Sequence, residues 1–408
     1  MKVQFLSSLK DLPSVFWLLC VATSLFYTSS HIFTTMLPIH LDDLHVKSSE
    51  TGALLASFLV ISILVRPLVG KLYDEWHPKK LFLIGLSFFA LGSILMLFLP
   101  NTLWALWVAR GLHGIGFSFF NGVSYSYLTE TVPSRIRARG IALFSNAIKL
   151  AMAYAPALGW MLAQEGLCYE SIWISLGILA LTFIAVFKMA EHHAPLVEEK
   201  KLANLIESPI VAPLPVQGRW FNLKGLTPGL LIATNSFVFG TLIPFVPLIV
   251  HAKGLGHVET FHIFYALSLI ASRFIGGEAS DKYGRFYTII PGMSVVVLSL
   301  FGMFLANSSV LFLASAILYG LGAGVVQPSI VAMVADRTHK GERGSAMATY
   351  TMLADSGQAL GMFAMGLMGQ YFSYNDGLAV TTGMAILGVA FAVFLAIKEK
   401  VRKYIPVV

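Results

Sequence analysis

Five ionisable side chains interrupt segments of the chain that are otherwise apolar. They are His31, Arg110, His113, Lys149 and Asp355. An imidazole exchanges protons near neutral pH, and a carboxyl group in an apolar environment has its charged form disfavoured, so histidine and aspartate at such positions can carry protons. Lysine and arginine there can bind the anionic group of a small molecule. Each residue also has a structural interpretation, as a hydrogen-bonded partner of a neighbouring helix, and the sequence leaves both interpretations open.

The composition around these residues is that of a membrane protein. Hydrophobic residues make up 56% of the 408 residues and charged residues only 12%, and the mean hydropathy is +0.75. In a soluble globular protein about a quarter of the residues are charged. Ionisable residues at membrane depth cost about 2.5–3.5 kcal/mol each on insertion scales, which makes each of the five a functional candidate.

The apolar segments are long enough to cross a bilayer as helices, for which about 20 residues are needed. The sequence therefore predicts an all-α integral membrane protein with about twelve transmembrane helices. The expected spans are 15–38, 49–69, 80–99, 102–128, 140–163, 171–190, 228–250, 258–277, 286–305, 309–334, 344–369 and 377–397. Lys149 lies ten residues after Arg139, about 15 Å along a helix and hence near the middle of a core about 30 Å thick.

The basic charge of the chain is explained by topology. The net charge is +7. If both termini are cytoplasmic, the outer loops hold only Lys47 and Lys253, and nearly all other basic residues lie on inner loops and tails. This is the positive-inside pattern, so we expect a multi-pass protein of a bacterial inner membrane and no nucleic-acid partner. The two cysteines give no disulfide framework.

The chain divides into two halves. Residues 191–225 are rich in Pro, Glu and Lys and are interpreted as a cytoplasmic linker. The linker separates an N-terminal six-helix bundle, 1–190, from a C-terminal six-helix bundle, 226–408.

The two halves repeat the same charged pattern at a nearly constant spacing, which predicts parallel repeats. Transporters built from such repeats have their binding site between the halves, near mid-membrane. At a spacing of 207 the pairs are Arg66 with Arg273, Gly70 with Gly277 and Asp74 with Asp281. At a spacing of 206 they are Glu130 with Asp336, Arg137 with Arg343, Asn121 with Gln327 and Lys149 with Asp355.

Several of these segments resemble signatures of the major facilitator superfamily. The loop segments GKLYD at 70–74 and GEASDKYGR at 277–285 resemble its cytoplasmic loop signature. ARGLHGIG at 109–116 resembles its fourth-helix signature, and AYAPALGW at 153–160 is similar to its fifth-helix antiporter signature. The chain most resembles the twelve-helix drug:proton antiporters and exporters of opine or siderophore type. The resemblance implies two pseudo-symmetric six-helix bundles.

The resemblance also implies that the loop charges act as gates. Such clusters latch the cytoplasmic side of the protein closed and break when it opens inward. Gly70 and Gly277 are expected where helix and loop approach closely, and Asp74 and Asp281 near positive helix N-termini. The expected gating residues are Arg66, Gly70, Asp74, Glu130, Arg137, Arg273, Gly277, Asp281, Asp336 and Arg343. The alternative is that these charges only anchor the topology.

Uncharged polar residues in the expected spans form a second group of candidate site residues. They either orient a ligand through hydrogen bonds or join helices. They are Tyr27, Asn121, Asn146, Asn235, Gln327 and Gln358. The small residues of Gly357-x-x-x-Gly361 and Ala155-x-x-x-Gly159 are expected to serve helix packing.

The sign of the buried charges predicts the class of substrate. The first half places bases and no acid in the membrane interior, which favours an anionic or zwitterionic organic molecule with an apolar part. The first hypothesis is a proton-coupled exporter, which we expect to be a monomer. The second is a proton-coupled importer of a carboxylate-rich solute such as a siderophore or metabolite, and the third is a membrane receptor or scaffold that transports nothing. No arrangement of residues indicates an enzyme, a metal site or a cofactor.

Overall fold

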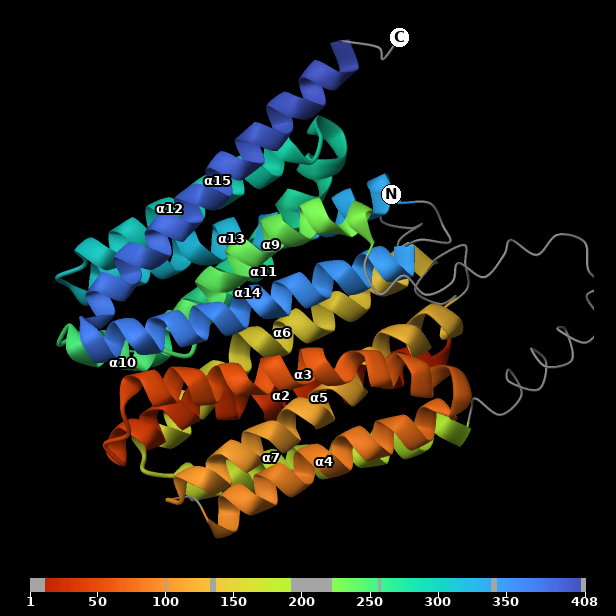
Figure 1. The fold of residues 1–408 in the computed structure, drawn as a ribbon, viewed down its shortest axis with the longest axis vertical. Coiled ribbons are helices and arrows are strands. Elements are labelled where there is room, and N and C mark those ends of the chain that lie inside the picture. Colours follow the sequence, from red (N-terminus) through yellow and green to blue (C-terminus); the bar gives the residue numbers. More distant parts are fainter. Residues whose placement is uncertain are drawn as a thin grey trace, which may run out of the picture. The chain divides into compact units, whose positions relative to one another are not determined.

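The computed structural model describes residues 12–99, 101–132, 137–191, 222–255, 258–338 and 343–404, and every element within these ranges is an α-helix (Figure 1). The helices are α2 (Ser14–Asp43), α3 (Ser48–Glu75), α4 (Pro78–Phe98), α5 (Leu103–Thr131), α6 (Arg137–Gln164), α7 (Cys168–Glu191), α9 (Leu223–Leu242), α10 (Val246–Ala252), α11 (Val258–Tyr283), α12 (Phe286–Leu305), α13 (Ser309–Arg337), α14 (Arg343–Tyr371) and α15 (Tyr374–Tyr404). Each of the twelve expected spans coincides with a long helix, with one interruption.

The interruption lies in the expected seventh span, 228–250, which is not one continuous helix. α9 ends at Leu242 and the short α10 begins at Val246. Pro244, in the turn between them, has no backbone N–H to continue the helical hydrogen bonds. The Nζ of Lys253, just after α10, donates to the carbonyls of Phe304 at 3.0 Å and Ala306 at 3.3 Å, and partial burial lowers the pKa of this lysine. These bonds fix the end of α10 against the end of α12.

Among the described residues, eight helices are long and apolar enough to cross a membrane by length and composition alone. The long helices outside that group are α5, α6, α11 and α14. Three of them, α5, α6 and α14, carry Arg110, Lys149 and Asp355 respectively. Large apolar side chains such as Leu64 and Phe98 are mostly exposed on the helix surfaces, as expected of an integral membrane protein.

The described residues group into two compact units. Unit 1 contains those up to Phe33, Ile61–Ala155 and those of Gly166–Gln217, and unit 2 contains Thr34–Val60, Pro156–Glu165 and those from Gly218 onward. The first turns of α3 and the last turns of α6 are thus grouped with the C-terminal helices. Most of the expected linker, 191–225, lies outside the described residues, so the domain boundaries stay a prediction.

Glycines allow close helix packing within unit 1. An ideal Cβ on Gly85 of α4 would lie 3.0 Å from the carbonyl oxygen of Gly116 of α5, and one on Gly92 would lie 2.7 Å from that of Ala109. Aromatic rings fill the adjacent space, as in the stacked pair of Phe26 and Phe120 with centroids 4.1 Å apart. α4 and α5 therefore pack backbone to backbone, with α7 on another side of α4.

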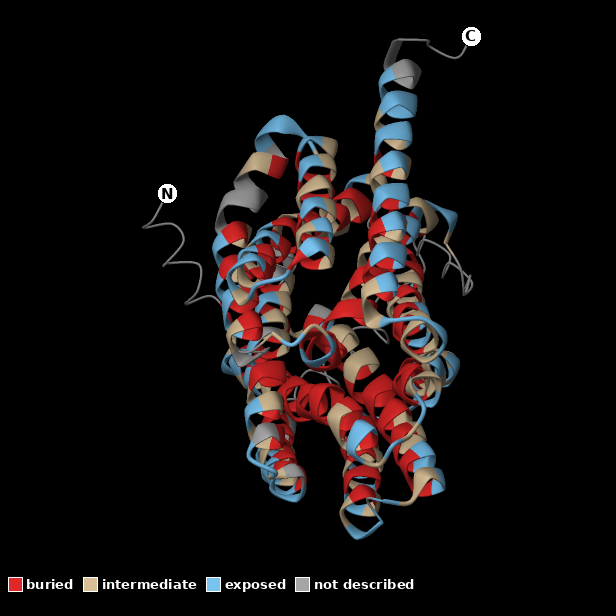
Figure 2. Ribbon diagram, turned by 90° about the vertical axis from the view of Figure 1, so that its left-hand side faces the viewer, coloured by how far each residue is buried: buried red, intermediate tan, exposed pale blue. Residues whose placement is uncertain are grey.

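Unit 2 contains an extensive glycine-based contact between α9 and α14, which lie along each other in Figure 1. A Cβ on Gly357 would collide with the carbonyl oxygen of Ala233, one on Gly361 with that of Phe237, and one on Gly240 with that of Gln358. The expected packing role of Gly357 and Gly361 is confirmed. In Figure 2 the C-terminal part of α15, which leads to the end marked C, is largely exposed.

Candidate functional site

Three consecutive polar residues of α2 connect this helix to three others within unit 1. Successive side chains of a helix point about 100° apart, so consecutive polar residues of one helix can each contact a different neighbouring helix. The hydrogen bonds are Tyr27 Oη to Asn121 Oδ1 of α5 at 3.0 Å, Thr28 Oγ1 with Tyr154 Oη of α6 at 2.6 Å, and Ser29 Oγ with Ser175 Oγ of α7 at 2.6 Å. These three hydrogen bonds fix the position of α2 against α5, α6 and α7. Tyr27 and Asn121, which form one of them, were both predicted as site residues.

One turn further along α2 lies His31, which is 6% exposed. Its Nδ1 is 3.1 Å from the carbonyl oxygen of Tyr27. Both Lys149 of α6 and Arg110 of α5 interact electrostatically with its ring. The structure therefore brings together three of the five predicted ionisable residues, from three different helices, in what we call the basic cluster: His31, Arg110 and Lys149.

The three members of the basic cluster differ in exposure. The Arg110 side chain is fully buried, at 1% exposed, whereas Lys149 is half-buried. Lys149 Nζ lies 3.4 Å from Met152 Sδ, a weak acceptor, one turn further along the same helix. Asn146, also predicted, is exposed one turn before Lys149. Of the cluster, Lys149 is the cation most accessible to an entering ligand.

His113 lies in a different environment, in the contact between α4 and α5. Its ring stacks on Phe89 with centroids 4.2 Å apart, and its Nε2 is 3.1 Å from Ser93 Oγ. Gly92 leaves room for the ring, since a Cβ there would lie 2.7 Å from its Cδ2. Although His113 interacts electrostatically with Arg110, these contacts favour its structural interpretation.

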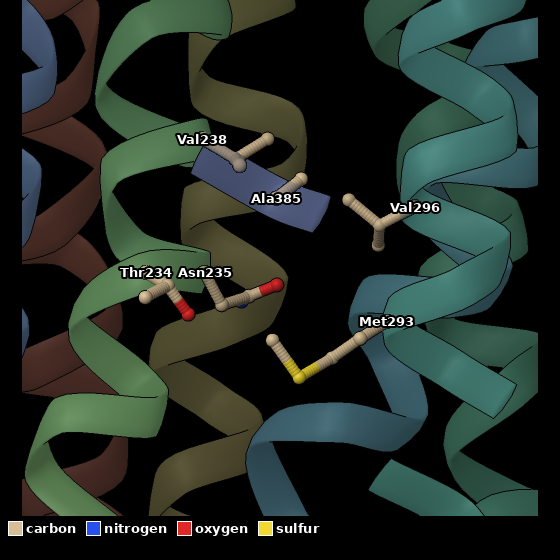
Figure 3. A pocket seen from close by; sticks show the side chains of 6 residues that line it. All are labelled: Thr234, Asn235, Val238, Met293, Val296 and Ala385. Atoms are coloured by element: carbon tan, nitrogen blue, oxygen red, sulfur yellow. The ribbon is translucent and has the colours of Figure 1, made fainter. Parts of the chain in front are cut away.

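The predicted polar residues of unit 2 lie on three helices, α9, α13 and α14. Asn235 lines a small crevice with Thr234, Val238, Met293, Val296 and Ala385, which has no space for a water molecule (Figure 3). Asp355 and Gln358 are half-buried on α14 and Gln327 on α13. Asp355 is two residues from Gly357, so it points to the side of α14 away from α9.

An ion pair joins the loop before α12 to the end of α13. The guanidinium of Arg285 donates from Nε to Asp336 Oδ2 at 2.7 Å and from Nη2 to Oδ1 at 3.4 Å, and its Nη1 donates to Ser280 Oγ at 3.1 Å. We call these three residues the latch. Asp336 was predicted as a gating residue with Arg343, whose side chain lies outside the described residues. The partner found is Arg285, which belongs to the loop signature but was not among the predicted gating residues.

Other predicted gating residues that the structure describes lie within helices and not in loops. Arg66 and Arg273 lie within α3 and α11, about 15 Å before the ends of these helices. Gly70 is exposed within α3 and a Cβ there would meet nothing within 4 Å, so the expected steric need for glycine at this position is wrong. Glu130 is exposed near the end of α5. The surroundings of Asp74, Arg137, Gly277, Asp281 and Arg343 lie outside what the structure describes.

A second contact, which we call the glycine gate, joins the first turns of α3 to α14 and α15 within unit 2. A Cβ on Gly52 would lie 2.8 Å from Gly366 Cα, and one on Gly366 would lie 2.6 Å from the carbonyl oxygen of Ser48. Ser48 Oγ also shares a hydrogen bond of 3.0 Å with Tyr374 Oη. The backbones of α3 and α14 thus touch at the end of α3 that is opposite to the loop signature.

Sequence reasoning missed four residues of these contacts: Thr28, Ser29, Tyr154 and Ser175. A signal was present, because the run of Tyr, Thr and two serines at 27–30 is unusual within an apolar span and indicates bonds to several helices. It also missed His262, which is fully buried in α11.

The comparison with known families accounts for this architecture. The model of the Major Facilitator Superfamily matches residues 19–309 and 229–406. The chain belongs to the Major Facilitator Superfamily. A match over nearly the whole chain agrees with the resemblance carried by the loop signature and by the fourth and fifth helices.

Relatives within the superfamily are named as exporters. The chain is 23% identical to the staphylopine export protein of Staphylococcus aureus over 384 residues, 92% of this chain and 94% of the relative. It is 23% identical to the multi-drug resistance efflux pump PmrA homolog of Lactococcus lactis over 399 residues, 92% and 93% of the two chains. These matches make the chain a transporter of the superfamily, similar to small-molecule exporters.

A solved structure shows the same fold. The bacterial homolog of the human lysosomal transporter Spinster, in an inward-facing and occupied conformation, superposes with a TM-score of 0.72. Its sequence is 14% identical, and the match covers 94% of this chain and 96% of that one. The likeness concerns the fold alone.

Proposed function

We propose that this protein is a proton-coupled secondary transporter that exports a small anionic or zwitterionic amphiphilic organic molecule by alternating access. The observation that carries the proposal is the basic cluster, in which α2, α5 and α6 each contribute a basic side chain to one place in unit 1. The names of the relatives favour export over import.

The basic cluster supports an anionic substrate through its energetics. Cationic groups removed from water lose solvation, and an anionic ligand that pairs with them recovers part of that free energy. Arg110 offers a planar fork suited to a carboxylate, whereas half-buried Lys149 offers a mobile point charge. Tyr27, whose ring lies 5.8 Å from that of His31 and 5.5 Å from that of Phe117, adds an aromatic surface for an apolar part of the ligand.

Two contacts at different helix ends support alternating access. The latch Arg285–Asp336 and the glycine gate lie in unit 2, at the loop between α11 and α12 and at the first turn of α3 respectively. We propose that the latch is on the cytoplasmic side of a bacterial inner membrane, with both termini, and that the monomer alternates by breaking one contact and forming the other. Asp355 is proposed as the residue whose protonation couples transport to a pH gradient.

The test uses purified protein and liposomes. A thermal-shift screen against anionic, zwitterionic and cationic amphiphiles is expected to yield mainly anionic hits, because a ligand that binds only the folded state raises the melting temperature. A hit is then loaded into liposomes with an imposed pH gradient, and its movement against its own gradient is measured. Hits dominated by lipophilic cations would overturn the substrate class, and accumulation in the direction of the proton flow would indicate the importer.

A further inference from the structure

We propose that His31 selects substrates that carry a neutral hydrogen-bond donor, such as a hydroxyl group, on the carbon next to their anionic group. This inference rests on the proposed function and narrows its substrate class to 2-hydroxy carboxylates and their analogues. The inference follows from the hydrogen bond made by Nδ1 of His31 and from the positive charges of Lys149 and Arg110 near the ring.

The backbone determines which nitrogen of His31 carries the proton. Nδ1 is 3.1 Å from the carbonyl oxygen of Tyr27, and a carbonyl oxygen only accepts. Nδ1 is therefore the N–H donor. In neutral His31 the second nitrogen, Nε2, then has a lone pair and accepts hydrogen bonds.

Within the part of the chain that the structure describes, no residue makes a hydrogen bond to His31 Nε2. The His31 ring also lies beside the ring of Tyr27, with centroids 5.8 Å apart. A ligand that donates to Nε2 gains a hydrogen bond there. A ligand without a donor leaves it unsatisfied.

The neighbours of His31 determine what kind of donor fits. Lys149 and Arg110 both interact electrostatically with His31 and would hold the anionic group of the ligand. An ammonium group donating to Nε2 would stand close to the same two cations and be repelled. A hydroxyl group donates a hydrogen bond and carries no charge. It can therefore bind to Nε2 without being repelled by Lys149 and Arg110.

The experiment compares matched ligands by isothermal titration calorimetry on the purified full-length protein. The probes are 3-phenylpropanoate, 2-hydroxy-3-phenylpropanoate and phenylalanine, which share an aromatic body and a carboxylate and differ at one carbon. We expect the hydroxy acid to bind about three- to tenfold more tightly than 3-phenylpropanoate, the range that one hydrogen bond supplies. Phenylalanine is expected to bind more weakly than the hydroxy acid.

The variants assign the preference to His31. His31→Leu is expected to bind the hydroxy acid and 3-phenylpropanoate equally, and His31→Gln, whose carbonyl oxygen accepts, is expected to keep part of the preference. His251→Gln, at an exposed position of α10, is the matched control and should keep all of it.

The possible outcomes distinguish a failure of this inference from a failure of the proposed function. Equal binding of both carboxylates by the unmodified protein, or a preference that survives in His31→Leu, would overturn the role of His31 and leave the anion site intact. Tighter binding of phenylalanine would overturn the requirement for a neutral donor. Binding of none of the three carboxylates would count against both the proposed function and this inference.

Discussion

Gly85 of α4 and Gly116 of α5 face each other so closely that a Cβ on Gly116 would lie 2.6 Å from the Gly85 carbonyl oxygen. The same relationship recurs in unit 2, where a Cβ on Gly322 of α13 would lie 2.6 Å from the carbonyl oxygen of Gly292 of α12. Gly292 is 207 residues after Gly85 and Gly322 is 206 after Gly116. The repeat predicted from loop charges therefore extends to the packing of corresponding helices.

Gly116→Val and Gly322→Val are each expected to destabilise the protein by about 1–3 kcal/mol, because the added methyl groups force two helix backbones apart. Thermal unfolding in detergent, followed by tryptophan fluorescence, measures the effect. Gly177→Val and Gly383→Val are the matched controls, since a Cβ at either exposed position meets nothing within 4 Å. Equal melting temperatures for all four variants would contradict the packing argument.

The sequence was sufficient to predict the helices and the repeat, because apolar length and charge spacing are local properties. It also singled out His31, Arg110 and Lys149, which interact electrostatically in the structure, since an ionisable residue is conspicuous in an apolar segment. It did not distinguish His113 from these three, because only the packing of α4 against α5 places that ring beside Phe89 and Ser93. The partner of Asp336 was missed for the same reason: the pairing depends on three-dimensional positions.

Lys149→Ala is expected to weaken binding of an anionic substrate by at least tenfold, because the most accessible cation of the basic cluster is lost. Lys149→Arg should keep part of the affinity, since the charge remains on a different head group. Calorimetry on the purified variants measures both, with Lys398→Ala, on the exposed end of α15, as control. An unchanged affinity in Lys149→Ala would show that Lys149 does not contact the substrate.

The latch is expected to matter for transport and little for stability. Asp336→Asn and Arg285→Gln remove an ion pair whose side chains are 53% and 23% exposed, so the free energy of unfolding should change by less than about 1 kcal/mol. Transport in liposomes should fall in both variants, because the conformation that the latch closes becomes less populated. Glu399→Gln, which removes a second exposed ion pair, with Arg337, is the control. Transport at the unmodified rate in both latch variants would refute the gating role.

Gly366→Val is expected to hold the glycine gate open, because the side chain would meet the backbone of Ser48 and Gly52. A cysteine introduced as Ser48→Cys, with both native cysteines replaced, should then react faster with a membrane-impermeant maleimide than it does with Gly366 present. Tyr374→Phe removes only the hydrogen bond to Ser48 and should give a smaller increase. If Gly366→Val leaves the labelling rate unchanged, the contact is not a gate.

Asp355 is the remaining charged candidate, and it lies on α14 in unit 2 at the position that corresponds to Lys149 in the repeat. Coupling to a pH gradient requires a residue that binds a proton in one conformation and releases it in the other, and we propose half-buried Asp355 for this role. Asp355→Asn has nearly the same shape but does not titrate. We therefore expect this variant to lose accumulation driven by a pH gradient while it still exchanges labelled substrate across liposomes at equal pH. Asp376→Asn, an exposed acid in the first turn of α15, controls for the loss of one negative charge and should behave as the unmodified protein. Gradient-driven accumulation that persists in Asp355→Asn would show that the proton is carried elsewhere, with His31 as the next residue to test.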